Sequence, residues 1–309
     1  MSDNGFSVTQ YENPATFAAI VEPLIAVDRG RSTIAATVLH GVIAAPDPDY
    51  LPVLVVVRGA DEPVGLAVAG ASSAASALVT QLISEQLTPD ERDEAGALLA
   101  SAFLGLDPPP AILTGPADGG RAFAAGYCAA AGGTFGVHNE LLLYRLGTLI
   151  EPTGAVGTAR VADVDDATDL ALLAEWRMKF AAATGAFPAV TAPDPDGVRR
   201  SAHRGVTSVL WTVEGQPVSL AAHSAVIGEM SRIGPVYTPE PLRSNGYAAA
   251  ATAAAVHSAR AEGAAEVVLF TEAANATSNG VYRRIGFVER GQFTEIALGT
   301  EPLGSTRHD

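Results

Sequence analysis

The sequence predicts a two-domain α/β protein. Its 309 residues are about twice the length of an ordinary domain. In both halves, segments with the apolar spacing of helices alternate with short β-rich segments. A stretch rich in proline and glycine, residues 151–157, separates the two series. We therefore expect one domain over residues 1–150 and a second over residues 157–309.

The first half is expected to contain helices, a hairpin and later strands. Apolar residues at helical spacing predict two helices within residues 14–45. A β-rich run, a turn and a second apolar run predict a hairpin over residues 51–69. Thr88, with Pro89 next and Glu91 three residues on, predicts the start of a capped helix. The other expected elements are helices at 75–85 and 118–131 and strands at 111–114 and 141–146.

The second half repeats a similar order of elements without a clear repeat of residues. Strands are expected at 158–161, 206–213, 218–226, 230–237, 266–271 and 287–298, of which the second and third form a hairpin. Helices are expected at 165–183, 246–261 and 277–285.

The composition limits the classes of partner. The formal net charge is −15 and the sequence pI is about 4.7. This balance disfavours nucleic acid, whose phosphates need basic patches, and suits cationic small molecules and basic peptides. No apolar run reaches the ~18 residues of a membrane span, and the N-terminal residues lack the pattern of a signal peptide. We expect a cytoplasmic protein without a membrane partner.

Cys128 is the only cysteine of the sequence. A single cysteine can form neither an intrachain disulfide nor a cysteine-based metal site, which fits a reducing compartment, and we expect no bound metal. Because Cys128 lies in a run of alanine and glycine, residues 124–132, we expect a small buried residue rather than a reactive thiol.

The segment with the strongest chemical signal is residues 233–248, which leads from a strand through a loop into a helix. The pattern Arg243-x-x-Gly246-x-Ala248 places small residues where the helix begins. The first turn of a helix offers unpaired backbone N–H groups and the positive end of the dipole, and small residues allow a pyrophosphate to approach them. The loop lacks the Lys-Ser/Thr pair of a P-loop and the three glycines of a dinucleotide site. Taken alone, the pattern also fits an ordinary turn from loop to helix.

A second segment, residues 275–287, changes this balance. It contains Asn275, then Tyr282 seven residues later, then Gly286 and Phe287. Together the two segments resemble the GNAT superfamily of N-acyltransferases. Residues 243–248 are similar to its acyl-CoA pyrophosphate loop, and residues 275–287 are similar to its closing Asn–Tyr–Gly-Phe pattern. The resemblance covers about residues 157–298 in the order of elements.

The resemblance implies a fold and a co-substrate. The fold is a mixed, mostly antiparallel α+β sheet with a splayed parallel strand pair, flanked by helices. Acetyl-CoA would lie at the splay between the strands at 230–237 and 266–271, with its pantetheine arm pairing with backbone near Val236 and Thr238. The residues expected to bind it are Val236, Tyr237, Thr238, Arg243, Ser244, Asn245, Gly246, Tyr247, Ala248, Asn275, Ser278 and Tyr282.

The resemblance also implies roles for two side chains. Asn275 would bond the pantetheine arm, and Tyr282 would lie near the thioester sulfur and protonate the leaving thiolate. A tyrosine with a pKa near 10 is a weak acid in water but donates a hydrogen bond to a developing thiolate in a dry site. Two other interpretations stay open at this point: Tyr282 as a core aromatic, and Asn275 as a helix N-cap, which is compatible with its binding role.

No motif fixes the base that takes a proton from the amine. Glu229, before the strand at 230–237, is the candidate, with His223 as an alternative. A solvated turn residue and a surface histidine are the competing interpretations of these two. His257, within the helix at 246–261, is expected to be a surface or packing residue.

These observations predict an acetyl-CoA-dependent N-acetyltransferase that moves the acyl group directly to a primary amine of a small molecule or peptide. The competing class is a non-catalytic acyl-CoA-binding or sensing protein, and an enzyme acting on protein N-termini or lysines is a further alternative. The oligomeric state, monomer or homodimer, is left open.

The first half lacks the acyl-CoA loop. The corresponding stretch, residues 70–76, reads GASSAAS. We therefore predict that residues 1–150 form a degenerate domain of the same family in tandem, with an unrelated α/β substrate-binding domain as the alternative.

Overall fold

The structure is a computed structural model that describes residues 5–44, 52–60, 62–72, 75–185 and 191–299. Contacts divide the chain into two compact units. Unit 1 comprises Met1–Leu141 and Gly291–Asp309, and unit 2 comprises Leu142–Arg290. The connector at 151–157, where the sequence places the domain boundary, lies inside unit 2.

Unit 1 is a sheet with helices on both faces. Its strands lie in the order β1-β2-β3-β4-β5-β12, where β12 is Phe287–Gly299, and β4 and β5 are a parallel pair. The elements are β1 (Ser7–Tyr11), α1 (Pro14–Val27), α2 (Thr33–Ala44), β2 (Val53–Gly59), β3 (Glu62–Ser72), β4 (Ala75–Ile83), α3 (Pro89–Ser101), β5 (Ile112–Pro116) and α4 (Ala117–Ala131). The predicted pair of helices, the hairpin, the capped helix and α4 are confirmed.

The core of unit 1 lies between the sheet and the pair α3 and α4. It contains Leu99 and Phe103 from the α3 side and Phe123 from α4, all fully buried against the sheet. The rings of Phe103 and Phe123 are 5.5 Å apart. Cys128, also on α4, is half-buried at the edge of this core, and burial raises the pKa of its thiol.

The helix predicted at residues 75–85 is wrong, because this segment forms β4. Leu78, Val79 and Thr80 pair with β3 on one side and β5 on the other. Alanine and serine at the start of the segment suggest a helix, but β-branched side chains and a central place in the sheet override that propensity. Strand β1 and a helix of unit 2, α6 (Pro195–His203), were also not predicted from the sequence.

Unit 2 has the same plan. Its strands lie in the order β7-β8-β9-β10-β11-β6, and β10 and β11 are its parallel pair. The elements are β6 (Thr134–Leu146), β7 (Thr158–Val161), α5 (Ala167–Thr184), α6 (Pro195–His203), β8 (Thr207–Val213), β9 (Gln216–His223), β10 (Met230–Tyr237), the 3-10 turn η1 (Glu240–Leu242), α7 (Tyr247–Ala261), β11 (Glu266–Glu272), α8 (Ala276–Arg284) and β12 (Phe287–Gly299). The mixed sheet predicted from the resemblance is confirmed.

Two strands are divided between the units. Strand β6 follows α4 of unit 1 along the chain, yet its residues from Leu142 onward belong to unit 2. Strand β12 ends the chain of unit 2, yet its residues from Gly291 onward belong to unit 1, where Phe293–Ala297 pair with β5. Unit 1 is therefore completed by a strand segment from the C-terminal part of the chain, whereas unit 2 is continuous in sequence.

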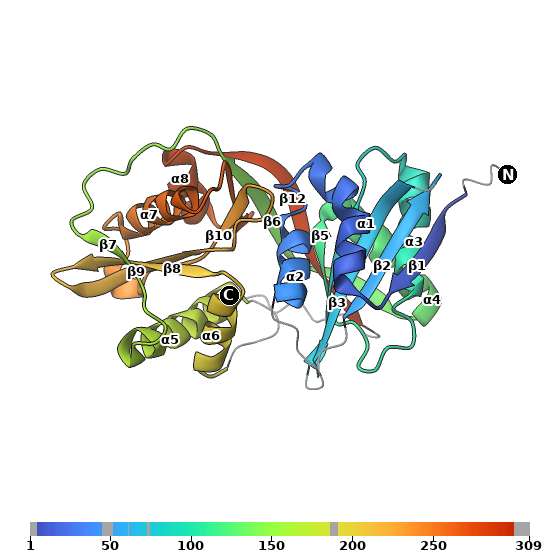
Figure 1. The fold of residues 1–309 in the computed structure, drawn as a ribbon, viewed down its shortest axis with the longest axis horizontal. Helices are drawn as coiled ribbons and strands as arrows, with labels where there is room; N and C mark the ends of the chain where they lie inside the picture. Colours follow the sequence, from blue (N-terminus) through green and yellow to red (C-terminus); the bar gives the residue numbers. More distant parts are fainter. Residues whose placement is uncertain (1–4, 45–51, 61, 73–74, 186–190, 300–309) are drawn as a thin grey trace. The chain divides into compact units, whose positions relative to one another are not determined.

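Helices cover both faces of the unit 2 sheet. In Figure 1, α7 and α8 lie on one side of its strands and α5 and α6 on the other. Ala251, Ala255 and Tyr282 belong to the core on the first side. Leu173 and Trp176 of α5 belong to the core on the second, with Val198 of α6. The sheet thus separates two apolar layers, and each strand presents alternate side chains to each.

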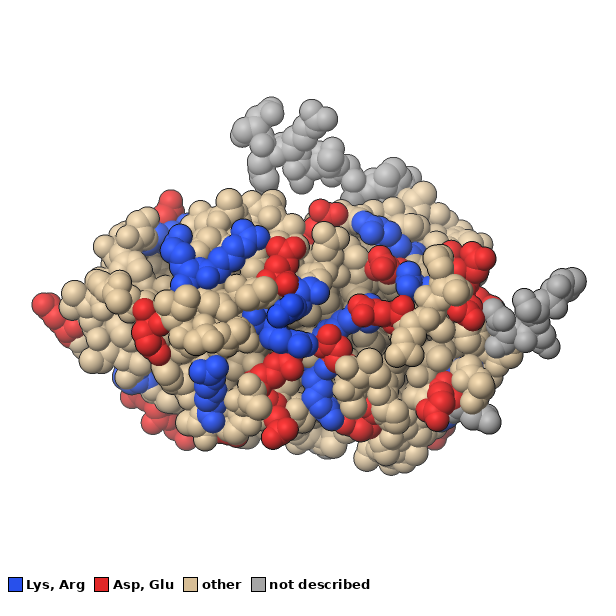
Figure 2. All heavy atoms as spheres, turned by 90° about the horizontal axis from the view of Figure 1, so that it is seen from above, with Lys and Arg blue, Asp and Glu red and all other residues tan. Residues whose placement is uncertain are grey.

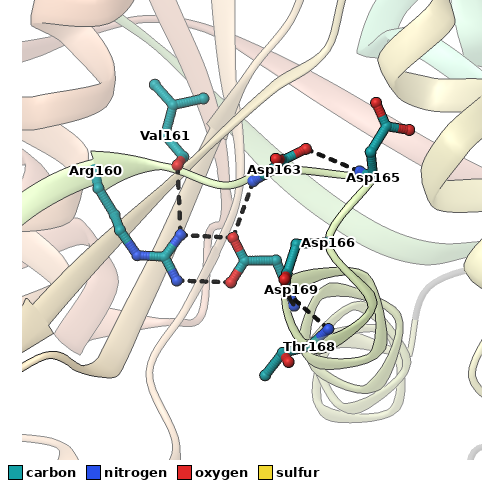
Figure 3. A network of polar contacts seen from close by, with 7 residues as sticks. All are labelled: Arg160, Val161, Asp163, Asp165, Asp166, Thr168 and Asp169. Carbon is teal, nitrogen blue, oxygen red and sulfur yellow. Dashed lines mark hydrogen bonds and ion pairs between the residues drawn. The ribbon is translucent and has the colours of Figure 1, made fainter.

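The N-terminus of α5 is held by a polar network, drawn in Figure 3. Asp166 caps the helix by accepting from the N–H groups of Thr168 and Asp169, both at 2.9 Å. The buried carboxylate of Asp169 accepts two bonds from the guanidinium of Arg160 on β7, at 2.5 and 2.6 Å, and a third from the Asp163 N–H. The side-chain hydrogen bonds from Arg160 lower the pKa of Asp169. This network fixes α5 against β7.

On the face shown in Figure 2, acidic and basic side chains are intermixed. Among the helices that the structure describes, none is both long and apolar enough to cross a bilayer.

Candidate functional site

The parallel pair β10 and β11 separates partway along its length. Their register runs from Met230 opposite Glu266 to Ile233 opposite Leu269 and ends there. On its other edge β10 continues to pair with β9, with a break in register after Ile233, through Val236 and Tyr237. Residues 234–237 therefore stay in the sheet through β9 while their edge toward β11 is open beyond the last pair. An open strand edge is what an extended ligand needs for backbone pairing.

The end of β10 is firmly positioned. The hydroxyl of Ser219 on β9 lies 2.8 Å from the Thr238 hydroxyl and donates to the Tyr237 carbonyl at 3.2 Å. The ring of Tyr237 packs on Trp176 of α5, with centroids 5.8 Å apart. The side chain of Tyr237 is thus committed to the α5 side, so only its backbone is available at the open edge.

Residues 243–246 form an exposed loop ahead of α7. Ser244 and Gly246 both have a left-handed backbone, with φ of 66° and 79°. The Nε of Arg243 donates to the Thr238 carbonyl at 3.2 Å, which ties the loop to the end of β10. The amide of Asn245 donates to the Leu242 and Arg243 carbonyls, both at 3.1 Å.

The first turn of α7 has no side-chain cap. Gly246 is the N-cap residue and makes no side-chain hydrogen bond, and no acidic residue lies in the first turn. The first N–H groups of a helix have no partner within it, so those of Tyr247 and Ala248 are left to a ligand or to water. The loop thus lies between the end of β10 and the start of α7, where the sequence predicts it.

The segment before α8 is held by a residue that the sequence analysis missed. Asn279, only 4% exposed, donates through Nδ2 to the carbonyls of Glu272, Ala273 and Asn275 at 3.1, 3.3 and 2.8 Å. Its Oδ1 accepts from the Tyr144 hydroxyl of β6 at 2.9 Å. The available signal was an asparagine four residues after Asn275, since the i+4 spacing returns it to the same face of the helix.

Asn275 is the N-cap of α8, as one interpretation proposed. Its Oδ1 accepts from the Ser278 N–H at 3.0 Å. This bond commits the side-chain oxygen, so the group left for a ligand is Nδ2, a donor. Ser278 is therefore part of the cap through its backbone.

Tyr282 is buried on α8, with 8% of its surface exposed. Its ring lies edge-on to Phe287, with centroids 6.1 Å apart, so it does contribute to the core. Burial raises the pKa of its phenol to about 12. Within the described part of the chain its hydroxyl has no hydrogen-bond partner, and its oxygen is not among the fully buried atoms, so a ligand or water can reach it. The position is apolar and the donor is free.

The structure does not bring Glu229 to these residues. Glu229 is exposed in the turn before β10, where its carbonyl accepts from Ala265 and Glu266 at 2.8 and 3.0 Å. Seven residues of strand separate it from Val236, which at the usual rise is about 23 Å. The sequence places Glu229 next to β10, but it does not show at which end of the strand the site lies. The direction of β10 in the fold decides this.

Neither histidine is presented at the end of β10. His223, expected at the surface, is fully buried, with its ring nitrogens 3.0 Å from the Ser224 carbonyl and the Ser258 hydroxyl. His257 is an exposed residue paired with Glu151 at 2.7 Å, as expected for a surface residue.

A cavity of about 390 Å³ lies against the α5 and α6 side of the separated strands. Gly234 and Pro235 form its wall on β10, beside Phe270 of β11. Arg177 of α5 and Arg232 of β10 also line it. It is therefore continuous with the part of β10 where pairing with β11 has ended. Neither arginine was predicted from the sequence. The one signal for Arg232 is that it is a lone charge in a strand segment.

The fold and these two segments define the class of protein. Residues 170–287 match the Acetyltransferase (GNAT) family. The match lies within the second half of the chain, and acyl transfer is the chemistry of that family.

Solved structures with the same fold include proteins of this class. A GCN5-related N-acetyltransferase from Kribbella flavida is 20% identical, with a TM-score of 0.55, over 89% of this chain and 97% of that one. A tandem GNAT protein from the clavulanic acid biosynthesis pathway, without acetyl-CoA, is 14% identical, with a TM-score of 0.60, over 95% and 99%. A GCN5-related N-acetyltransferase from Sphaerobacter thermophilus is 16% identical, with a TM-score of 0.57, over 94% and 95%. No curated protein sequence matches the chain. At these identities the likeness concerns the fold.

Proposed function

We propose that the chain transfers an acetyl group from acetyl-CoA directly to the primary amine of a small molecule or peptide. The observation that carries this proposal is the uncapped first turn of α7, which follows the open end of β10. The free N–H groups and the helix dipole suit the diphosphate of coenzyme A, and Arg243 adds a positive charge. The open edge at residues 236–238 suits an extended pantetheine arm.

The residues present fit this co-substrate in further respects. Gly246 is exposed, and an added Cβ there would meet nothing nearer than 3.6 Å. Ala248 and Ala249 keep the first turn free of bulk. We assign to the donor the backbone of Val236, Tyr237 and Thr238, the loop Arg243, Ser244, Asn245 and Gly246, the first turn Tyr247 and Ala248, and Asn275, Ser278 and Tyr282.

Acetyl-CoA, when bound, supplies the acetyl group as a thioester. The amine nitrogen forms a bond to the acyl carbon as the carbon–sulfur bond breaks, the amine loses a proton, and the sulfur gains one. In this proposal the chain holds the amine in the cavity, next to the end of β10. Holding the two reactants in this geometry lowers the barrier by proximity and orientation. The Tyr282 hydroxyl donates a hydrogen bond to the departing sulfur. Neither Glu229 nor His223 is retained as the general base, because Glu229 lies at the other end of β10 and the ring of His223 is buried against Ser224 and Ser258.

We also propose that unit 1 does not bind acyl-CoA. Its equivalent of β10–α7–β11 is β4–α3–β5, a second parallel pair joined by a helix. The first turn of α3 is closed by the capping box of Thr88 and Glu91, whose acidic side chain repels phosphate. The stretch that corresponds to the acyl-CoA loop is thus residues 84–88, and not 70–76 as the sequence analysis expected.

The separation between β4 and β5 is also filled. After their last pair, Thr80 with Thr114, the buried Gln81 donates to the Pro116 carbonyl at 2.9 Å. A Cβ at Gly115 would lie 2.5 Å from the Gln81 Nε2, so this glycine is needed to admit the side chain. In unit 2 the residue after the last pair is Gly234, and a Cβ there would meet nothing within 4 Å. The contrast supports a single acyl-CoA site, in unit 2.

The test of the proposed function is a charge reversal at the loop. Arg243→Glu should weaken coenzyme A binding about 100-fold, measured by titration calorimetry, because a charge-assisted bond becomes a repulsion. Arg260→Glu, an exposed residue at the far end of α7, is the matched control and should bind as the parent does. Thiol release from acetyl-CoA with a panel of amines measures turnover. Unchanged binding by Arg243→Glu would remove the assignment of the loop, and binding without turnover on any amine would favour a sensing protein.

A further inference from the structure

The side chain of Arg232 is directed to the cavity by its place on β10. Its neighbour Ile233 belongs to the core on the α7 and α8 side. Successive side chains of a strand point to opposite faces, so Arg232 points to the α5 and α6 side. Arg232 accordingly lines the cavity together with residues from both of these helices.

Arg232 is half-buried, and one nitrogen of its guanidinium is fully buried without a partner. Its Nη1 is closed off from water and has no hydrogen bond, and no ion pair of Arg232 exists among the residues that the structure describes. Burial lowers its pKa to about 10. An arginine carries five donors and is almost never buried unless paired. A buried donor without a partner is costly, so a positive group of this kind beside an empty space favours a negatively charged partner from outside the chain.

The other charges of the lining leave it positive. Arg177 donates to the Ser201 hydroxyl at 2.9 Å, and burial lowers its pKa. Asp194 is the acid of the lining, and its carboxylate is already used: it accepts from the Gly197 N–H at 2.8 Å and from Arg200 at 3.1 Å. Two guanidinium groups against one engaged carboxylate give the lining a formal charge of +1. This is unexpected in a chain with a net charge of −15.

We infer that the acceptor of the proposed acetyl transfer is an amine that also carries an anionic group, a carboxylate or a phosphate, which pairs with Arg232 in this cavity. The inference rests on the proposed function for the amine, and on the cavity alone for the anion. Gly234 and Pro235 join the cavity to the open edge of β10, so a molecule whose anion lies at Arg232 extends toward the acyl donor. Apolar walls from Phe180 and Phe270 suit a carbon skeleton between the two groups.

The fork of the guanidinium matches the two oxygens of a carboxylate or phosphate, with Arg177 adding charge nearby. An acceptor that lacks the anion leaves Arg232 unpaired. Leaving a polar group of the site unpaired typically costs far more binding free energy than losing an apolar contact. Arg232 is therefore expected to discriminate strongly between amines that carry an anionic group and amines that lack one.

The test uses pairs of amines that differ in the anion alone. The full chain is assayed with acetyl-CoA on L-phenylalanine against phenethylamine, and on aminoethyl phosphate against ethanolamine. We expect kcat/KM to be at least ten times higher for the anionic member of one pair, and the pair identifies whether a carboxylate or a phosphate is preferred. Arg232→Met should lower kcat/KM for that member about 100-fold and leave its neutral partner within a few-fold. Arg199→Met, on the exposed side of α6, is the control and should keep the parent ratio.

A second measurement separates this inference from the proposed function. Binding of the same four amines to the chain without coenzyme A is measured by titration calorimetry. Binding that depends on the anion and on Arg232, without turnover, supports the anion site and refutes the transferase. Turnover with equal kcat/KM for both members of each pair refutes the anion site and leaves the transferase standing.

The melting temperature of Arg232→Met separates an anion site from a structural role of Arg232, because the two predict opposite changes. Replacing an unpaired buried charge by an apolar side chain of similar length should hold or raise the melting temperature. A clear drop would mean that Arg232 supports the fold, and would overturn the inference. If Arg232→Met does not fold, Arg232→Lys is used instead, because lysine keeps the charge without the forked guanidinium. An unchanged preference of Arg232→Lys for the anionic amine would also overturn the inference.

Discussion

In the proposed transfer, the hydroxyl of Tyr282 is better suited to donate a hydrogen bond than to act as an acid. With a pKa of about 12, it stays protonated throughout the physiological range. The reference pKa of a thiol is about 8.5, so full transfer of the proton to a thiolate is uphill by about 3.5 units, or roughly 5 kcal/mol. A hydrogen bond to the developing charge carries no such penalty and is stronger in a dry site. The buried, unpartnered position of this phenol suits that role.

Tyr282→Phe should therefore lower kcat about 100-fold with little change in coenzyme A affinity, because the bond forms only as charge develops on sulfur. The measurement is steady-state thiol release together with titration calorimetry. The same variant checks the pKa: the tyrosinate absorbance lost on substitution should titrate near pH 12. A normal kcat would make Tyr282 a packing residue against Phe287.

At the scale of the element, α5 connects stability to the candidate site. Its first turn is fixed by Asp169 and Arg160, and two turns later it supplies Arg177 to the cavity. Asp169→Ala should lower the free energy of unfolding by about 2 kcal/mol, because the bonds to Arg160 and to the Asp163 N–H are lost. Urea denaturation at pH 7 measures this, with the exposed Asp165→Asn as the control that should stay within 0.5 kcal/mol.

The sign of the pH dependence follows from the lowered pKa of Asp169. The pKa of Asp169 in the folded chain lies below the ordinary aspartate value of 3.8, so the folded chain binds the proton less tightly than the unfolded one. The stabilising contribution is present above about pH 4 and is lost as the pH falls through the folded pKa. The difference in stability between the parent and Asp169→Ala should shrink below that pH. A difference that stays constant to pH 2 would contradict this cause.

At the scale of the whole molecule, the division of β6 decides which fragments fold. Leu142 and Tyr144 belong to the unit 2 core, yet the sequence assigns them to the first domain. Losing two buried residues of this size costs roughly 2–5 kcal/mol each, which approaches the 5–15 kcal/mol that stabilises an ordinary domain. A fragment of residues 142–290 should melt cooperatively by circular dichroism, and a fragment of residues 157–290 should not. Equal melting of the two would mean that β6 is dispensable to unit 2.

The sequence by itself determined the features that depend on neighbours along the chain. The capping box at Thr88 and Glu91 and the loop from Arg243 to Gly246 are signals a few residues long, and each formed where it was expected. The general plan of a mixed sheet with a parallel pair followed from the order of such elements. Local backbone chemistry is enough for these features, because a cap or a turn is satisfied within its own segment.

The tertiary structure decided what depends on partners distant in sequence. Residues 75–83 became a strand because β3 and β5 lie on either side, and Glu229 proved remote because β10 runs away from it. The unpaired charge of Arg232 is of the same kind, since nothing in a sequence states which donors remain unsatisfied once a core has closed. Burial and pairing are properties of surfaces that meet only in the folded chain, and for that reason the anion cavity could be found only there.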